Sequence, residues 1–180
     1  MRLFVAVDIP GEIKEKLWEA AKAFELKGVI LSKKENYHVT LQFLGEVDES
    51  RLQGVKDALS SVKAEGFGVT LSGISTFDAT LRVIFAEVKA GSEELRKIYS
   101  QIDAELAKKG IRYEAENSYK PHVTLARVKF AKDKTPIPPL IRKYSSYDFG
   151  RFKARAIVLK VSRPSGSGYV YENIHKVELR

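Results

Sequence analysis

The 180-residue sequence contains no cysteine. This absence excludes a disulfide framework, a thiol nucleophile and a zinc–thiolate site. No apolar run approaches the length of a membrane span, so we expect no membrane partner. The first ten residues, MRLFVAVDIP, lack the small-residue cleavage site of a signal peptide and have the pattern of a strand. A cytoplasmic location is the resulting expectation.

Charged residues are plentiful, but the sequence lacks any run of five or more basic ones. Apolar residues make up 44% and charged residues 30%, which is typical of a soluble globular protein and not of a disordered one. The 31 Lys and Arg outnumber the 23 Asp and Glu, which leaves a net charge of +8. The excess favours an anionic partner such as nucleic acid, without marking where it binds.

Histidine and threonine are also scarce, with three and six residues in the whole chain. Two of each nevertheless occur in one repeated tetrapeptide, HVTL, at residues 38–41 and again at residues 122–125. A repeat of this kind has a probability of roughly one in a thousand by chance. We therefore interpret the repeat as functional.

Apolar periodicity predicts strands and helices in a mixed order. Helices are expected after Pro10-Gly11, from Asp48 and from Ser92, where apolar residues recur at helical spacing. Residues 131–146 are expected to form a Pro-rich loop with a short helical turn, and 162–168 a flexible loop. Strands are predicted over 2–9, 29–31, 37–43, 67–75, 81–88, from the second HVTL to 130, 152–161 and 169–179. Because there is no strict strand–helix–strand rhythm, the pattern indicates an α+β fold with mostly antiparallel sheet.

The chain also contains a weaker internal repeat. LFVAVDIPGEIKEKL (3–17) resembles VIFAEVKAGSEELRKI (83–98) at a shift of about 81 residues, close to the 84 that separate the two HVTL motifs. Each copy is an apolar strand, a turn and an amphipathic helix that precede an HVTL strand. We expect one domain over 1–180, built as two pseudo-symmetric lobes with outer helices around a central cleft.

Strand geometry gives the repeated tetrapeptide a chemical meaning. Alternate side chains of a strand share a face, so each His lies beside its Thr while Val and Leu anchor the strand in the core. Imidazole titrates near pH 6.5, so His38 and His122 can serve as a general acid and a general base at physiological pH. The hydroxyls of Thr40 and Thr124 can donate hydrogen bonds to charge on a reacting group. In-line displacement at phosphorus needs such an opposed pair.

Other types of site fit the sequence less well. Neither motif has an Asp, Glu or Cys beside its His, which leaves too few ligands for a catalytic metal, and no motif for ATP or a serine nucleophile occurs. We expect no metal and no cofactor. The third histidine, His175, has no Thr two residues on and is expected at the surface or rim.

At these residues the chain resembles a known family. The segments RLFVAVDIP, ENYHVTLQFLGEV and KPHVTLARV are similar to those of the 2H phosphoesterases, and most of all to the RNA 2′,3′-cyclic phosphodiesterases, also called 2′-5′ RNA ligases. The resemblance covers almost the whole chain. It implies a two-lobed α+β fold, no metal, hydrolysis of an RNA 2′,3′-cyclic phosphate to a 2′-phosphate, and reversible 2′-5′ ligation of tRNA halves as a side activity.

The resemblance also implies roles for individual residues. His38 matches the general acid, His122 the residue that activates water, and Thr40 and Thr124 the phosphate-binding hydroxyls. Arg127 matches a basic residue that holds the phosphate, but its odd offset from His122 would turn it to the opposite face of a regular strand. A bulge that re-aims it toward the cleft is one solution, and a plain surface charge is the other. By the same parity, Phe43 is expected in the core.

Two rival functions stay open on the sequence. A non-catalytic protein that binds RNA ends would have the same charge and cleft, and an enzyme could act instead on a cyclic nucleotide or an ADP-ribose cyclic phosphate. We expect a monomer. Residues 132–139 and 162–168 are candidates for mobile substrate contacts because they are polar and rich in Pro or Gly.

Overall fold

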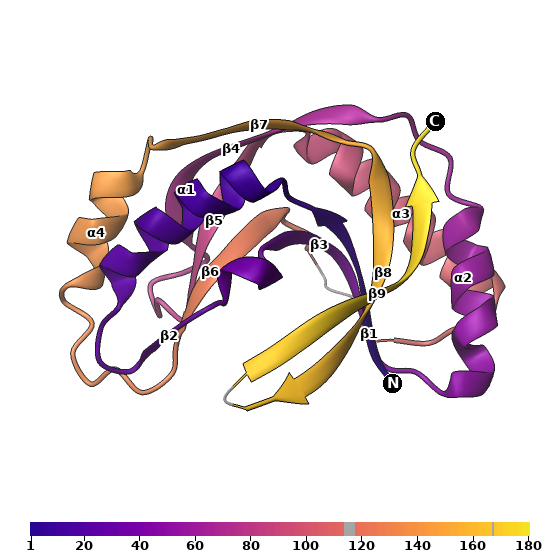
Figure 1. Cartoon of the computed structure of the whole chain (residues 1–180), viewed down its shortest axis with the longest axis horizontal. Coiled ribbons are helices and arrows are strands. Elements are labelled where there is room, and N and C mark those ends of the chain that lie inside the picture. Colours follow the sequence, from indigo (N-terminus) through magenta and orange to yellow (C-terminus); the bar gives the residue numbers. More distant parts are fainter. Residues whose placement is uncertain (114–117, 167) are drawn as a thin grey trace.

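The computed structural model describes residues 1–113, 118–166 and 168–180. Two antiparallel sheets form its centre (Figure 1). The four-stranded sheet has the order β3 (His38–Glu46), β1 (Arg2–Asp8), β8 (Ala156–Ser165), β9 (Gly168–Glu178). The five-stranded sheet has the order β2 (Val29–Leu31), β6 (His122–Val128), β5 (Val83–Ala90), β4 (Phe67–Thr76), β7 (Asp148–Ala154). The predicted α+β fold with antiparallel sheet is confirmed.

The helices form where apolar residues recur at helical spacing. Four α-helices occur in the described part of the chain: α1 (Gly11–Ala21), α2 (Leu52–Ser60), α3 (Ser92–Lys108) and α4 (Ile137–Tyr144). Single 3₁₀ turns, η1 (Lys22–Phe24), η2 (Lys34–Asn36) and η3 (Glu49–Arg51), lie between α1 and β2, between β2 and β3, and between β3 and α2. The buried face of α3 consists of apolar residues three or four apart, as predicted: Leu95, Ile98, Ile102 and Leu106.

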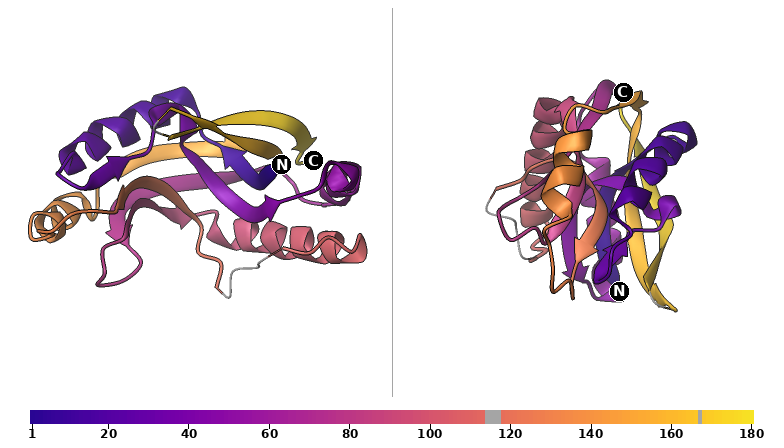
Figure 2. Two further views of the ribbon diagram at one scale, coloured as in Figure 1. Left: turned by 90° about the horizontal axis from the view of Figure 1, so that it is seen from below. Right: turned by 90° about the vertical axis from the view of Figure 1, so that its left-hand side faces the viewer.

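Each of the two long helices, α1 and α3, follows a strand of one sheet and packs on strands of the other. Helix α1 follows β1 of the four-stranded sheet but packs on β6 and β7 of the five-stranded one. Helix α3 follows β5 of the five-stranded sheet and packs on β3 of the other, as well as on β5 itself. Figure 2 shows α1 and α3 on opposite sides of the strands. Each lobe therefore covers part of the other, in keeping with the predicted pseudo-symmetric lobes.

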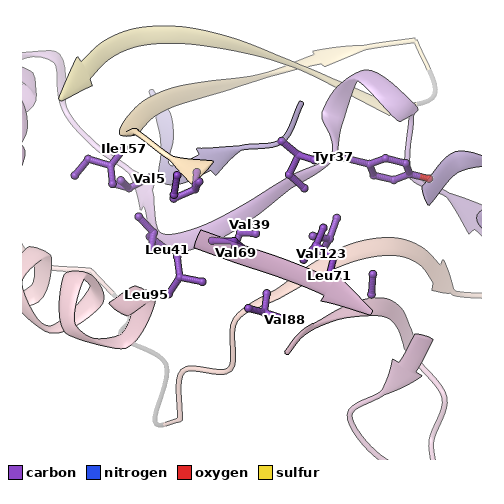
Figure 3. Close-up of a cluster of buried hydrophobic side chains, with 14 of the residues drawn as sticks. Val5, Tyr37, Val39, Leu41, Val69, Leu71, Val88, Leu95, Val123 and Ile157 are labelled. Carbon is purple, nitrogen blue, oxygen red and sulfur yellow. The ribbon is translucent and has the colours of Figure 1, made fainter. Parts of the chain in front are cut away.

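The apolar residues of both HVTL motifs anchor their strands in one core. Val39, Leu41, Val123 and Leu125 are at most 1% exposed. Figure 3 shows Val39, Leu41 and Val123 in a cluster that also draws side chains from α3 and from both sheets. Burial of these side chains fixes the strands on either side of each His and Thr.

Residues 131–146 differ from the expectation of a loop with a short turn. The segment contains α4, two turns long, with Ile137 fully buried. Pro138 and Pro139 lie in its first turn, where backbone N–H groups have no partner within the helix, so the prolines do not interrupt it. The prediction from proline content was therefore wrong about the length of this helix.

The predicted strand over 152–161 is two strands in different sheets. Residue Arg155 separates β7 of the five-stranded sheet from β8 of the other, which the alternation of apolar residues does not reveal. The expected loop at 162–168 is also different, because β8 and β9 stay paired as far as Ser165 and Gly168. Residue 167 of that segment lies outside the described residues.

Candidate active site

The two motif histidines occupy equivalent places in the two sheets. His38 is the first residue of β3 and lies opposite Asp8 of β1. His122 is the first residue of β6 and lies opposite Glu87 of β5. By this register, β1 and β5 correspond at a shift of 79 residues, from 8 to 87. The shift of 81 estimated from the sequence is therefore two residues too large. The motif strands β3 and β6 contact each other, which brings the two motifs together.

The imidazole of His38 is held at both nitrogens. Its Nδ1 lies 2.6 Å from the carbonyl oxygen of Asn36, and its Nε2 lies 2.9 Å from Oγ1 of Thr40. A carbonyl oxygen can only accept, so Nδ1 carries the proton of the neutral ring and Nε2 accepts from the Thr40 hydroxyl. The predicted pairing of His and Thr along the strand is present here.

The imidazole of His122 is fixed by the same backbone device. Its Nδ1 lies 2.7 Å from the carbonyl oxygen of Lys120, again two residues earlier in the chain. Nδ1 therefore donates, and Nε2 is left as the basic nitrogen. The rings of Phe77 and Phe85 pack on this imidazole with centroids 4.8 and 5.2 Å away, as Phe4 and Tyr171 do on His38.

Both histidines are neutral in the free site at neutral pH. Burial lowers the pKa of His38 to about 4, with the hydrogen bond to Asn36 opposing the shift. Burial also lowers the pKa of His122, and the positive charges of Arg127 and Lys120 lower it further. Burial therefore opposes the protonated form that one of the two rings needs in order to act as an acid.

An ion pair between a buried lysine and an exposed aspartate lies near His38. The ammonium of Lys160 is 2.7 Å from Oδ1 of Asp8 and 2.5 Å from Oδ1 of Asn173, and the Lys160 side chain is 9% exposed. Asp8 favours the protonated form of His38, whereas the Lys160 charge disfavours it. The pair places one positive and one negative charge near the imidazole, so it adds no net charge to the site.

A β-bulge follows each motif and decides which side chains face the cleft. In β3 the register skips Leu41, and in β6 it skips Leu125, so in each strand two consecutive residues are buried. Arg127 consequently faces outward on the same side as Thr124, which is the first of the two solutions expected from the sequence. Phe43 turns outward in the same way and is 47% exposed, so the prediction that it belongs to the core was wrong.

A cleft of about 410 Å³ joins most of the predicted site residues. His38, Thr40, Thr124 and Arg127 all line it. His122 lines a small adjoining depression, whose wall includes Thr40 and Phe43 of the cleft as well. His175 lies elsewhere: its Nε2 is 3.1 Å from Oγ of Ser60 in α2, at the rim of the molecule as predicted.

Two tyrosines of the site had no marker in the sequence. Tyr171 of β9 lines the cleft and contacts the His38 ring edge-on at 5.5 Å. Tyr119 stacks on Tyr99 of α3 and donates a 2.9 Å hydrogen bond from its hydroxyl to the carbonyl oxygen of Thr40. That bond ties the segment before the second motif to the backbone of the first.

Comparison with known proteins agrees with this arrangement. The profile of the AKAP7 2′5′ RNA ligase-like domain matches residues 11–179. The chain is 39% identical over 176 residues to the RNA 2′,3′-cyclic phosphodiesterase of Methanocaldococcus jannaschii, with 97% of this chain and 98% of that protein covered. The chain belongs to the 2′-5′ RNA ligase-like family of 2H phosphoesterases. A second 2H phosphoesterase, the RNA 2′,3′-cyclic phosphodiesterase of Archaeoglobus fulgidus, is 34% identical, with 99% of this chain and 100% of that protein covered.

Solved structures give the same fold for this 2H phosphoesterase. The protein TT0787 of Thermus thermophilus superposes with a TM-score of 0.84 at 27% identity, covering 100% of this chain and 98% of that one. LigT of E. coli complexed with 3′-AMP superposes with a TM-score of 0.82 at 23% identity, covering 99% and 97%. The likeness to LigT concerns the fold alone.

The described residues of the phosphoesterase provide neither a cluster of metal ligands nor a helix suited to span a membrane. Among the described residues, no group of three or more His, Asp or Glu side chains is placed to hold a metal ion. No helix in the described ranges is both long and apolar enough to cross a membrane. The cytoplasmic location expected from the sequence stays a prediction.

Proposed function

We propose that this protein hydrolyses RNA 2′,3′-cyclic phosphate ends to 2′-phosphates. The observation that carries the proposal is the pair of imidazoles, each with Nδ1 tied to a backbone carbonyl, so that Nε2 is the basic nitrogen of each ring. Two threonines and an arginine accompany them. The relatives named RNA 2′,3′-cyclic phosphodiesterase, at 39% and 34% identity, support the same reaction.

The proposed reaction is an in-line displacement at phosphorus. Nε2 of His122 accepts a proton from water as the water oxygen bonds to phosphorus. The bond from phosphorus to the 3′ oxygen breaks, and protonated His38 gives its Nε2 proton to that leaving oxygen. The products are a 2′-phosphate and a 3′-hydroxyl, and solvent returns the two histidines to their starting states. Each proton transfer contributes roughly 10²–10⁴-fold in rate.

His38 must gain its proton when the substrate binds. Its free pKa of about 4 leaves it neutral at pH 7, but a phosphodiester anion beside the ring favours the imidazolium. Nε2 then turns from acceptor to donor while Nδ1 keeps its bond to the Asn36 carbonyl. The substrate thus creates the acid that it needs.

The other polar groups of the cleft bind the phosphate. We assign Thr40 and Thr124 to the non-bridging oxygens, since both residues line the cleft together with His38. Arg127 supplies a fixed positive charge and planar donors that suit a phosphate. Beyond the effect of burial, its charge further lowers the pKa of His122, which favours the neutral form that a general base requires.

The same site accounts for ligation. If the 5′-hydroxyl of a second RNA replaces water as nucleophile, the identical displacement leaves a 2′-5′ phosphodiester, and two tRNA halves would be joined in this way.

We also infer that the protein acts as a monomer, because the residues assigned here come from a single chain.

The decisive assay uses a short RNA ending in a 2′,3′-cyclic phosphate, incubated with the protein in EDTA. Appearance of a 2′-phosphate, and not a 3′-phosphate, supports the proposed reaction. Binding of the RNA without turnover would favour the rival function, an RNA-end-binding protein. Preferential turnover of a cyclic mononucleotide or of ADP-ribose cyclic phosphate would keep the chemistry and replace the substrate.

A further inference from the structure

A second groove opens from the cleft at Arg127. It has a volume of about 260 Å³ and shares Ser32, Arg127, Tyr169 and Tyr171 with the cleft that holds His38. One wall is the edge strand β2 with the residues that follow it, and the other is the end of the β8–β9 hairpin. Apart from Asn36, whose backbone carbonyl holds His38, the reaction proposed above uses none of the residues that belong to this groove alone.

The groove carries two positive charges of its own. Lys33 and Lys129 line it. None of the ion pairs among the described residues involves either lysine or Arg127. The described lining includes no Asp or Glu. These cations are therefore available to an anionic ligand and are not neutralised by the protein.

An aromatic side chain lies between the groove and the cleft. Tyr169 lines both, is 42% exposed, and has the guanidinium of Arg2 5.7 Å from its ring centroid. Its backbone carbonyl accepts a 2.9 Å hydrogen bond from Nδ2 of Asn36, which ties the hairpin to the segment that precedes His38. A fixed, half-exposed ring beside free cations is the combination that binds single-stranded nucleic acid, through base stacking and phosphate contacts.

We propose that this groove binds the nucleotide on the 5′ side of the cyclic phosphate end, so that the preferred substrate is single-stranded RNA and not a mononucleotide. The proposal rests on the reaction proposed above. A cyclic phosphate occupies the 2′ and 3′ oxygens of the last ribose, so the RNA can continue only from its 5′ oxygen. With the last nucleotide in the cleft, the next phosphate passes Arg127 toward Lys33 and Lys129, and the next base stacks on Tyr169.

The test compares cyclic-ended mono-, di- and trinucleotides of one base as substrates. Wild type is expected to have a kcat/KM roughly tenfold or more higher for the dinucleotide than for the mononucleotide. The double variant Lys33→Ala/Lys129→Ala should lose most of that advantage while its mononucleotide kinetics stay within about twofold. Lys63→Ala/Lys97→Ala is the matched control, because it removes two lysines from a groove beside α3 and should keep the advantage.

Salt dependence and stacking give independent measurements. The dinucleotide has one phosphate besides the cyclic one, so loss of the lysine contacts with it should reduce the slope of log KM against log salt by roughly 0.7. Tyr169→Ala should weaken dinucleotide use roughly tenfold, whereas Tyr169→Phe, which keeps the ring, should not.

The outcomes separate the groove from the active site. Equal wild-type kcat/KM for mono- and dinucleotide, with turnover of both, would overturn the groove and leave the phosphodiesterase intact. A dinucleotide advantage that survives removal of Lys33 and Lys129 would also overturn it. No turnover of any substrate would remove the proposed function and, with it, this inference.

Discussion

A bulge three residues after each histidine turns the side chain of the fifth residue outward, where a regular strand would bury it. Arg127 consequently lines the cleft, where its charge adds to burial in lowering the pKa of His122. The equivalent position after His38 is Phe43, so the two copies of the motif differ in chemistry at this point. One lobe supplies a charge to the cleft and the other a ring.

Replacement of Arg127 by Ala should lower kcat/KM by roughly 10²-fold or more, since a charged hydrogen bond to phosphate is lost from the cleft. Arg127→Lys should recover part of the loss, because it restores the charge without the planar pair of donors. Steady-state kinetics on a cyclic-ended RNA measures both. Wild-type kinetics in Arg127→Ala would return this residue to the status of a surface charge.

The lowered histidine pKa values set the expected pH dependence. His38 must be protonated to act as acid, and its pKa of about 4 makes that form increasingly rare as pH rises. We expect kcat/KM to peak on the acid side of neutrality and to fall about tenfold per pH unit from about pH 7 to about pH 9. The falling limb of kcat should lie at higher pH, because bound phosphate raises the pKa of His38.

Measurement of both profiles over the range in which the protein stays folded checks this expectation. A kcat/KM that is constant from about pH 5 to about pH 9 contradicts proton transfer by these histidines.

At the residue level, strand alternation was enough to pair His38 with Thr40 and to bury the Val and Leu of both motifs. It could not place Phe43, because a bulge is a change in backbone pairing that depends on the neighbouring strand. Arg127 and Phe43 stand at the same offset from their histidines. This equal offset was the hint in the sequence that both side chains face the same way relative to their motifs. The two tyrosines, Tyr119 and Tyr171, come from segments without a repeated motif and needed the tertiary structure.

At the scale of elements, one hydrogen bond links the two motif segments directly. The Tyr119 hydroxyl donates to the carbonyl of Thr40, while its ring stacks on Tyr99 at 4.5 Å. The bond fixes the backbone of β3 beside the residue assigned to phosphate binding. It also joins parts of the chain that are 79 residues apart.

Tyr119→Phe removes that hydroxyl and keeps the ring. We expect the free energy of unfolding to fall by about 1 kcal/mol, the usual net value of such a bond. We also expect the fold decrease in kcat to exceed the fold increase in KM. Urea unfolding and steady-state kinetics of the variant measure the two effects. Unchanged stability and unchanged kcat would mean that the link has no energetic role.

The elements themselves were predictable where periodicity was long and uninterrupted, as in α3 with its four buried apolar residues. Segments were misjudged where the partner decided the outcome. Residues 152–161 alternate like one strand, but the chain passes from one sheet to the other at Arg155. Helix α4 was expected only as a short turn, because prolines in a first turn resemble those of a loop.

At the scale of the whole molecule, the two lobes share one hydrophobic core and each supplies a helix that covers the other. Helices α1 and α3 pack across the sheets, and β8 and β9 from the end of the chain complete the sheet that β1 begins. The buried apolar residues of both lobes form one cluster. We propose that residues 1–180 fold as a single cooperative domain.

Denaturant unfolding tests this directly, because the only tryptophan, Trp18, lies on α1 and packs against the shared core. Fluorescence of Trp18 and far-ultraviolet circular dichroism should give superimposable transitions with one midpoint. Two separated midpoints would indicate lobes that unfold independently. The result matters for function because the cleft is lined from both sheets.

The central claim is that His38 and His122 carry the reaction together. The most direct measurement is kcat on a cyclic-ended RNA, in EDTA, for His38→Ala, His122→Ala and the double variant, with His175→Ala as a control for loss of a histidine. Each single variant should lose roughly 10²–10⁴-fold, the double variant should lose little more than the worse single, and His175→Ala should match wild type. Near-wild-type kcat in either motif variant would contradict the account.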